Sequence, residues 1–282
     1  MPQKDSFEKI DHMIDKYVVF SIINSYKIQR GRFMSRGGQC IDGQICFHMC
    51  LNGNNYVVQS NSLLGGKQSL SINSAKLIRS AIMQVVRDDI ELKPYIITIS
   101  ELSDLLSISK SNLYRDIEKI TDEILTSHVD VRLEYGEKLK WKKINWVSFI
   151  EYQSDAGIAI KLNNDLKPYL LNLREKYTQY TLDNILAMKS IYAIRIFELL
   201  QEKILVKLIP KTGLYVEMSV QYIRECCDCE NKYEKFSHFK SRVLDTAVNE
   251  INRVTLYNVN YTYIKKGKLI DGIKFFINMS YH

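Results

Sequence analysis

Two stretches of the chain carry side chains that can hydrogen-bond to nucleic-acid bases and phosphates. In the later stretch, Arg242 follows His238 by one helical turn. A guanidinium can pair with guanine N7 and O6, and a histidine can donate to a base or a phosphate. A lone histidine is more often a surface or structural residue, so its functional interpretation depends on the residues around it. The candidate contacts of this stretch are Lys235, Ser237, His238, Ser241 and Arg242.

The earlier stretch offers the same chemistry from different residues. Asn112 can pair with adenine N6 and N7 and Arg115 with guanine, while a helix N-terminus favours phosphate. The candidate contacts here are Lys110, Ser111, Asn112, Arg115 and Lys119. A polar face is also what any solvated helix presents, so one such helix alone would favour that plainer interpretation.

Apolar stripes predict the two helices that would position these side chains. Over residues 110–125 the apolar positions recur at steps of four, three and four, at Leu113, Ile117, Ile120 and Ile124. Over residues 233–251 the predicted buried side holds Phe236, Phe239, Val243 and Ala247. A shorter helix precedes each one, at 101–106 with Ser100 as its N-cap and at 219–226. A short helix, a break and a longer helix therefore occur twice.

A β-hairpin rich in lysine follows each helix pair. The first hairpin offers Lys138, Lys140, Lys142 and Lys143, and the second offers Lys265, Lys266 and Lys268 at its tip. Lysines there would suit the DNA backbone or minor groove, which fix position without reading sequence. These lysines could also keep the protein soluble or prevent the exposed strands from pairing with another chain. The same bias in both hairpins favours the DNA interpretation.

The order of parts is the same in both halves: a long helix, a short strand, two helices and a hairpin. In the first half these are a helix at 71–86, a strand at 95–99, the helix pair and strands at about 129–135 and 140–150, with a further strand at 158–162 and a helix at 165–173. In the second they are a helix at 183–206, a strand at 214–218, the helix pair and a hairpin at 255–279. The stretch at 175–180 before them is interpreted as an interdomain linker or as the end of the preceding helix. We therefore expect an α+β fold of two tandem winged-helix domains, at 54–175 and 176–282, behind a poorly ordered extension at 1–53.

Composition narrows the class of protein. The 282 residues carry a net charge of +7, which favours a polyanionic partner. No apolar run approaches a membrane span, so we expect a cytoplasmic protein without a membrane partner. The six cysteines fall in a widely spaced group (Cys40, Cys46 and Cys50) and a Cys-Cys-x-Cys group (226–229), and are interpreted as reduced thiols and not as a zinc site, with Cys226 packed in a core. No metal and no cofactor are expected.

The chain lacks the sequence motifs of three kinds of enzyme. The five histidines form no His-hydrophobic-His pair, which a rolling-circle nickase needs for its metal. Gly66-Lys67 is followed by Gln68, and position 61 is Asn, so a phosphate-binding P-loop fails twice. The tyrosines could hide a recombinase nucleophile, with Arg195 and Arg242 as clamps, but His238 has Ser241 in place of the expected arginine. No catalytic residue and no enzymatic activity are predicted.

Four stretches give the chain a family resemblance. They are Tyr56-Val-Val-Gln-Ser-Asn61, Ser190-Ile-Tyr-Ala-Ile-Arg-Ile-Phe-Glu-Leu-Leu200, Phe236-Ser-His-Phe-Lys-Ser-Arg-Val-Leu-Asp-Thr-Ala-Val-Asn-Glu-Ile-Asn252, and Lys265-Lys-Gly-Lys268 before Ile273-Lys-Phe275. From about residue 57 to 277 the chain resembles the double winged-helix plasmid replication initiators, which bind iterons. Family members often have proline where this chain has Thr246, so the helix is expected to stay continuous here.

The resemblance implies a function and partners. It implies a cytoplasmic initiator that binds direct repeats of double-stranded origin DNA through both winged helices. It further implies a homodimer that associates through the first domain and represses its own gene, with the host initiator and replicative helicase as partners. Arg195 would be structural or phosphate-contacting. The alternatives are a strand-cleaving nickase or recombinase, and a plain winged-helix repressor.

Overall fold

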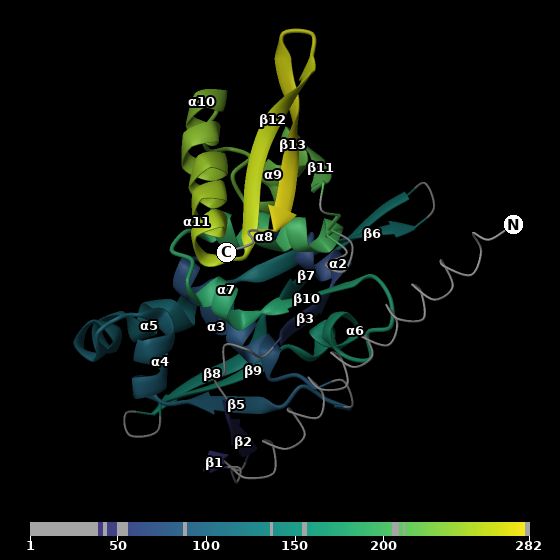
Figure 1. Cartoon of the computed structure of the whole chain (residues 1–282). Coiled ribbons are helices and arrows are strands. Elements are labelled where there is room, and N and C mark those ends of the chain that lie inside the picture. Colours follow the sequence, from purple (N-terminus) through teal and green to yellow (C-terminus); the bar gives the residue numbers. More distant parts are fainter. Residues whose placement is uncertain are drawn as a thin grey trace, which may run out of the picture.

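Two units joined by one helix make up the described part of the chain. The computed structural model describes residues 39–41, 44–49, 56–86, 89–135, 138–153, 157–204, 209–210 and 212–279, and within 39–48, within 132–140 and at 153 the backbone alone. Helix α8 (Ile191–Lys203) joins the units, and each unit contains a helix pair followed by a β-hairpin (Figure 1). The predicted α+β arrangement with a repeated helix pair and hairpin is confirmed.

Seventeen elements of the first unit lie within the described residues, and several of the helices begin on a side-chain cap. In chain order they are β1 (Gln39–Ile41), β2 (Gln44–His48), β3 (Tyr56–Ser60), α2 (Asn61–Leu64), β4 (Lys67–Gln68), α3 (Ile72–Met83), β5 (Pro94–Ile97), α4 (Ile99–Leu106), α5 (Lys110–Thr126), β6 (His128–Tyr135), β7 (Lys138–Asn145), β8 (Val147–Gln153), β9 (Gly157–Leu162), η1 (Asn164–Leu166), α6 (Lys167–Leu170), β10 (Tyr177–Thr181) and α7 (Leu182–Leu186). The side chains of Ser71 and Ser109 accept from backbone N–H groups that helices α3 and α5 leave free.

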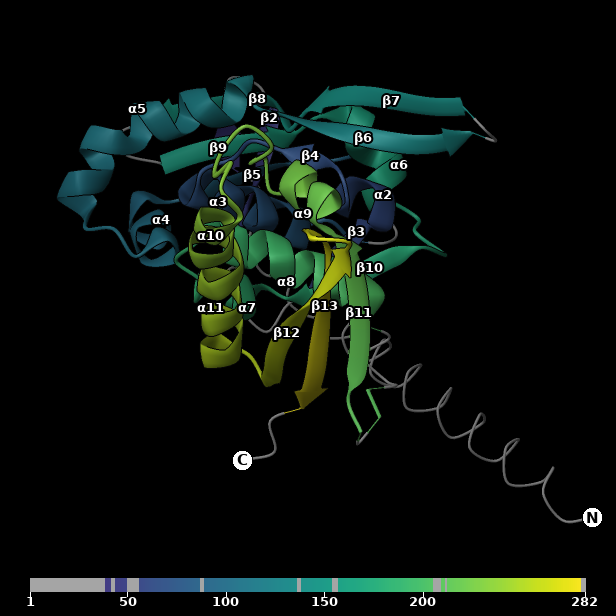
Figure 2. The same ribbon diagram turned by 90° about the horizontal axis from the view of Figure 1, so that it is seen from above.

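The strands of the first unit form three sheets. Five strands pair in the order β1-β2-β5-β9-β8, with β2 parallel to β5. The hairpin β6–β7 pairs instead with β4, and β10 pairs with β3. Because only β4 extends its sheet, the hairpin projects from the body of the unit as a two-stranded arm (Figure 2).

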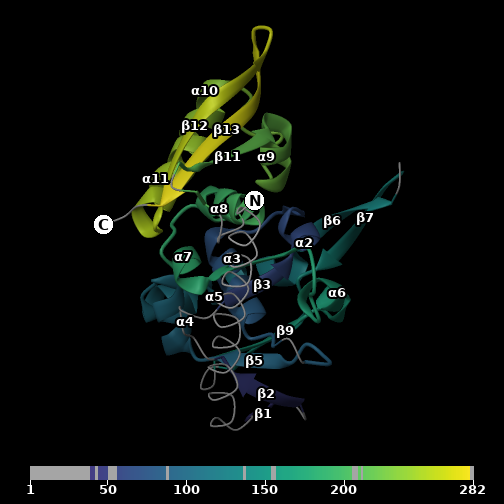
Figure 3. The same ribbon diagram turned by 45° about the vertical axis from the view of Figure 1, so that its right-hand side comes forward.

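The second unit has one sheet and one composite helix. After α8 it contains β11 (Leu214–Ser219), α9 (Val220–Cys226), α10 (Phe236–Phe239), the π-helical segment η3 (Lys240–Asp245), α11 (Thr246–Val254), β12 (Tyr257–Lys266) and β13 (Leu269–Met279). The strands pair in the order β11-β13-β12. The segments α10, η3 and α11 run as one rod beside the long hairpin β12–β13, whose tip stands clear of the rest (Figures 1 and 3).

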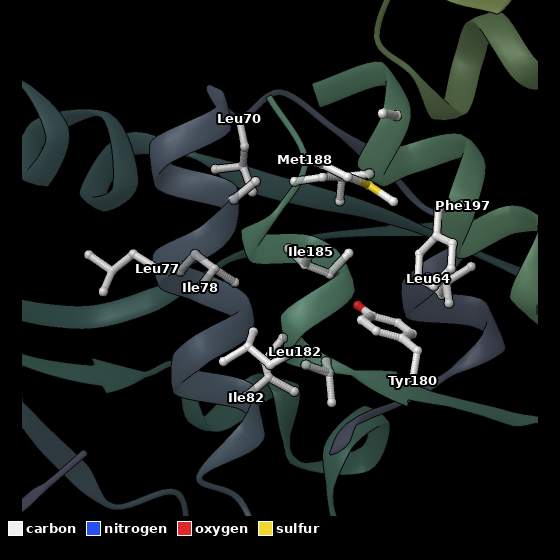
Figure 4. Close-up of a cluster of buried hydrophobic side chains, with 14 of the residues drawn as sticks. Leu64, Leu70, Leu77, Ile78, Ile82, Tyr180, Leu182, Ile185, Met188 and Phe197 are labelled. Carbon is white, nitrogen blue, oxygen red and sulfur yellow. The ribbon is translucent and has the colours of Figure 1, made fainter. Parts of the chain in front are cut away.

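A continuous apolar core extends from the first unit into α8. Figure 4 shows side chains of α3 facing those of α7, with Phe197 of α8 beside Leu64 and Tyr180. Its labelled members are Leu64, Leu70, Leu77, Ile78, Ile82, Tyr180, Leu182, Ile185, Met188 and Phe197, all buried. The rings of Tyr180 and Phe197 meet edge to face with their centroids 5.6 Å apart. Helix α8 is therefore packed as part of the first core, although it also begins the second unit.

Two predicted boundaries in the first unit are wrong for local reasons. Helix α4 begins on Thr98, not Ser100, because Thr98 and Glu101 cap each other reciprocally. The strand predicted at 140–150 is two strands of different sheets. Trp146 separates them, since its ring is buried in the core and its backbone bonds to Ser127 and Asn163.

The predicted linker and long helix between the units are also wrong. Residues 177–180 of this stretch belong to β10, which pairs with β3 and so continues the first unit past residue 175. The helix predicted at 183–206 is two helices, α7 and α8. The break is stabilised by Glu250, whose Oε2 accepts from the backbone N–H groups of Lys189 (2.8 Å) and Ser190 (3.1 Å). That partner lies 60 residues away, and the local periodicity does not reveal it.

The expected extension at 1–53 contributes structure where it is described. Strands β1 and β2 form a hairpin, β2 joins the five-stranded sheet at β5, and Met49 is buried. The other residues of this range lie outside the described residues. The boundary at 53/54 therefore stays a prediction.

Candidate nucleic-acid interface

A tight turn holds the first helix pair. Ser107 ends α4 in the left-handed conformation (φ 55°), and the Ser103 hydroxyl donates to the Ile108 carbonyl across the turn (2.6 Å). The Ser109 hydroxyl then accepts from the backbone N–H of Asn112 (3.4 Å). These bonds fix the N-terminal end of α5, which is the end that enters the major groove in helix-turn-helix proteins.

The two sides of α5 are those that the periodicity predicted. Its buried residues are Leu113, Ile117, Ile120 and Ile124. Its candidate contacts are all exposed: Lys110, Ser111, Asn112, Arg115 and Lys119. Arg115 bonds to the carboxylate of Asp116 through Nε (3.0 Å) and Nη2 (3.2 Å), which raises the pKa of Arg115 and lowers that of Asp116. A base or phosphate would compete with this neighbour for the guanidinium.

The lysines of the first hairpin have acidic neighbours. Lys142 Nζ lies 3.5 Å from an oxygen of Asp165, and Lys143 Nζ lies 3.6 Å from an oxygen of Asp130. Both lysines are exposed, so each ion pair is weak and open to exchange for a phosphate. The side chains of Lys138 and Lys140 lie outside the described residues.

Arg224, which no sequence pattern marked, positions the second helix pair. Its Nη1 donates to the Lys232 carbonyl (2.7 Å) and its Nη2 to that of Tyr233 (2.8 Å). The guanidinium also lies over the ring of Phe239, 4.3 Å from its centroid. One arginine of α9 thereby fixes both the connecting turn and the start of the following helix.

The second helix begins at residue 236, three residues later than predicted. Tyr233 adopts a left-handed conformation (φ 56°) and Lys235 an extended one, so Lys235 precedes the first turn. The candidate contacts of this stretch are all exposed: Lys235, Ser237, His238, Ser241 and Arg242. Arg242 has no ion-pair or hydrogen-bond partner among the described residues, which distinguishes it from Arg115.

Ser241 and Arg242 lie in a π-helical segment. The chain stays helical through Thr246 as expected, but hydrogen bonding shifts to the wider π register over η3. The Thr246 hydroxyl donates to the Ser241 carbonyl (3.1 Å), which supplies a partner at that bend. A π segment changes the angular spacing of side chains, and such segments occur frequently at functional sites.

The second hairpin packs one face on the domain and extends its tip into solvent. Val259, Ile273, Phe275 and Ile277 are buried, as the alternation predicted. The exposed tip carries Lys265, Lys266 and Lys268. The hairpin is tied to the helix through Asp245, which accepts from the Tyr261 hydroxyl (2.5 Å) and pairs with Lys240 (2.6 Å). Helix and hairpin therefore form one body.

Arg195 does not belong to the exposed set. It is 1% exposed, and its three nitrogens all have partners inside the protein. Nη2 donates to the carbonyls of Leu64 (2.7 Å) and Gly66 (2.9 Å), Nε to that of Cys226 (3.1 Å), and Nη1 to Glu198. Of its two predicted roles the structural one is therefore correct, because a phosphate cannot reach it.

A buried charged cluster lies where the two units meet. Glu198 of α8 pairs with Arg195 of the same helix and with Arg79 of α3. The Tyr180 hydroxyl and the Gln59 amide also donate to Glu198. Burial would raise the pKa of Glu198, but the two guanidiniums and these donors hold it at about 2. Glu198 therefore stays ionised, and its ion pairs link the two units.

The C-terminal cysteines have a packing role. Cys226, Cys227 and Cys229 are free and buried, and burial raises the pKa of each thiol. Raised pKa values disfavour the reactive thiolate. Within the described ranges, no three His, Cys, Asp or Glu residues are grouped so as to hold a metal ion. None of the described helices is both long and apolar enough to cross a membrane.

The chain is similar in sequence to two proteins of Escherichia coli. A replication initiation protein of Escherichia coli is 24% identical over 184 residues, which cover 64% of this chain and 55% of that protein. The chain thus spans about half the length of this relative. The PI protein of Escherichia coli is 25% identical over 205 residues, covering 64% of this chain and 67% of that protein.

A solved structure and two family models match the same architecture. The crystal structure of Pi initiator protein in complex with iteron DNA aligns with a TM-score of 0.63 at 22% identity, over 80% of this chain and 98% of that one. This match shows the fold. The model of the initiator replication protein WH1 domain matches residues 56–201, and that of the initiator Rep protein WH2 domain matches residues 219–277. Together they cover most of the chain, which therefore belongs to the family of Rep replication initiators with two winged-helix domains.

Proposed function

We propose that this chain initiates plasmid replication by binding repeated origin DNA sequence-specifically through both winged-helix units. The observation that carries the proposal is the repetition of one geometry. Each unit has a helix with an exposed arginine on its polar face, followed by a hairpin with exposed lysines. Two such units suit one duplex gripped at two places. The Pi relative, whose crystal structure contains iteron DNA, supports this use of the fold.

The two units have different roles in DNA binding in this proposal. The second unit is the principal reader, because Arg242 has no partner among the described residues and lies on a helix fixed by Arg224 and Asp245. The first unit adds grip, since the pairing of Arg115 and of the described lysines with carboxylates weakens its hold on DNA. We further propose that this unit mediates self-association.

The remaining parts of the proposal concern partners. The initiator acts in the cytoplasm, recruits the host initiator and the replicative helicase, and represses its own gene as a dimer. Family membership supports this set of partners, and co-purification of the full chain with each host protein on origin DNA is the direct assay for them.

One experiment tests the central proposal. A footprint of the purified chain on the DNA flanking its own gene should show protection repeated at a regular spacing, and the same DNA should support replication of a marker plasmid only when the chain is supplied. Protection without replication would make the chain a plain repressor. Nicking of supercoiled DNA with a covalent tyrosine adduct would make it a strand-cleaving enzyme.

A further inference from the structure

Leu269 is an apolar side chain placed among lysines at the tip of the second hairpin. It is 76% exposed, the highest value for a large apolar residue within 212–279. Along the same strand, Ile273, Phe275 and Ile277 are buried, so the exposure belongs to the tip and not to the strand. Isolated exposed leucines are common on protein surfaces, and the residues around Leu269 distinguish it from them.

The surroundings of Leu269 are cationic and free to bind an anion. Lys266 is its direct partner across the ladder, Lys265 precedes Lys266 in the same strand, and Lys268 is the second residue of the turn. All three are exposed and have no ion-pair partner among the described residues. Lysines beside an apolar side chain match the minor groove of DNA, where phosphates line the edges and apolar wedges can enter between base pairs.

The tip is shaped to enter a groove. The turn is two residues long, and its first residue, Gly267, has φ 64°, as primed hairpin turns require. A Cβ built on Gly267 would meet no atom within 4 Å, so the turn stands clear of the rest of the chain. Figures 1 and 3 show the hairpin extending beyond the other elements of the second unit.

The tip also has a fixed relation to the exposed helix. The rings of Phe236 and Tyr263 meet with centroids 5.5 Å apart, and the Tyr261 hydroxyl donates to Asp245. Phe236 and Asp245 belong to the helix, whereas the two tyrosines belong to the hairpin. When the helix occupies a major groove, the hairpin therefore cannot swing away from the neighbouring minor groove.

We propose that Leu269 enters the minor groove beside the groove occupied by the 236–254 helix, and that it bends the duplex by wedging between base pairs. Lys265, Lys266 and Lys268 hold the phosphates on either side of the wedge. The inference rests on the proposed DNA binding and adds to it a deformation of the bound site. Specificity then extends to the base step under the tip, because flexible steps are easier to open.

The test compares two leucines of the same hairpin region. Leu256 is 65% exposed at the opposite end of the hairpin, far from the lysine tip. The probe is the duplex that the unaltered chain selects from a random pool, labelled at both ends so that energy transfer reports the bend. Leu269→Ser is expected to reduce the bend by roughly 20° or more and to weaken binding about tenfold. Leu256→Ser is expected to change neither, and Leu269→Met to keep both.

The experiment separates failure of the proposed DNA reading from failure of the proposed wedge. If no sequence is selected, the proposed DNA reading fails. If a sequence is selected but Leu269→Ser bends it as the unaltered chain does, the wedge is wrong while the DNA reading stands. A folding control is provided by the circular dichroism of the three variants. A single nick in the duplex under the tip should increase the affinity of the unaltered chain more than that of Leu269→Ser. An equal increase in both affinities would also refute the wedge.

Discussion

Glu198 and Arg79 form a two-point ion pair although they lie 119 residues apart in the chain. Nε of Arg79 is 3.0 Å from Oε1 and Nη2 is 3.0 Å from Oε2, and both side chains are 0% exposed. Arg195 adds a second guanidinium to the same carboxylate and reaches the carbonyls of Leu64 and Cys226. The cluster joins α3, the α2–β4 turn, α8 and α9, so it fixes how the two DNA-binding units are oriented.

Removing the charge of Glu198 should destabilise the protein strongly. Glu198→Gln leaves two guanidiniums buried without their carboxylate, a change that typically costs about 3 kcal/mol or more. The free energy of unfolding from urea denaturation measures this. Glu217→Gln is the matched control, since Glu217 pairs with Lys274 on the exposed β11–β13 face and should cost less than about 1 kcal/mol. Equal losses for the two variants would show that the buried cluster contributes no more than a surface pair.

The low pKa of Glu198 predicts that the folded chain loses stability in acid. The pKa of Glu198 is about 2 in the folded chain against an ordinary value of 4.5. A depressed folded-state pKa gives stability that is present above pH 4.5 and lost as the pH falls toward 2. Urea denaturation at a series of pH values should therefore show the gap between the unaltered chain and Glu198→Gln narrowing below pH 4.5. Parallel curves across that range would contradict the assignment.

Arg195 should behave as a structural residue. Arg195→Lys replaces a planar group that reaches three carbonyls and a carboxylate with a single ammonium, so we expect a loss of roughly 3 kcal/mol in unfolding free energy. The salt dependence of DNA binding by the folded fraction should stay unchanged, because Arg195 releases no counterion. A shallower salt slope at unchanged stability would restore the phosphate role.

Local patterns predicted the elements better than the junctions between them. The stripe from Leu113 to Ile124 and the alternation from Ile273 to Ile277 are set by burial on one face, which periodicity reports directly. The break before α8 depends on Glu250, and strand β10 depends on pairing with β3, so both need partners distant in the chain. Neither can be inferred from the residues beside it.

In the candidate site, too, local patterns predicted some features and missed others. Exposure of the α5 face and of the tip lysines follows from the stripes beneath them and was predictable. The burial of Arg195 was not, because an arginine within an apolar helix suits either a phosphate or an internal carboxylate, and Glu198 decides between them. Arg224 was missed since its partners are backbone carbonyls, which no side-chain pattern reveals. The π register at Ser241 and Arg242 likewise has no sequence signature that we recognise.

Arg242 should read sequence. Arg242→Ala is expected to weaken binding to the selected duplex by about 1–3 kcal/mol while leaving binding to random DNA nearly unchanged, because a guanine pair is lost. Fluorescence anisotropy with both duplexes measures the two affinities. Arg253→Ala, at the far end of the same rod, is the control, since Arg253 donates to the Ala187 carbonyl. Equal losses on specific and random DNA would assign Arg242 to the backbone.

Lys266 should hold DNA without reading it. Its ammonium lies at the tip, has no ion-pair partner among the described residues, and can release one counterion on meeting a phosphate. Lys266→Ala should therefore weaken binding to all sequences alike and reduce the slope of log K against log salt by about one unit. Titrations at several salt concentrations measure this slope. Lys274→Ala is the control, because Lys274 lies on the same hairpin away from the tip and pairs with Glu217 of β11, so its slope should not change. If Lys266→Ala weakened binding only to the selected duplex, Lys266 would be contacting bases and not phosphates.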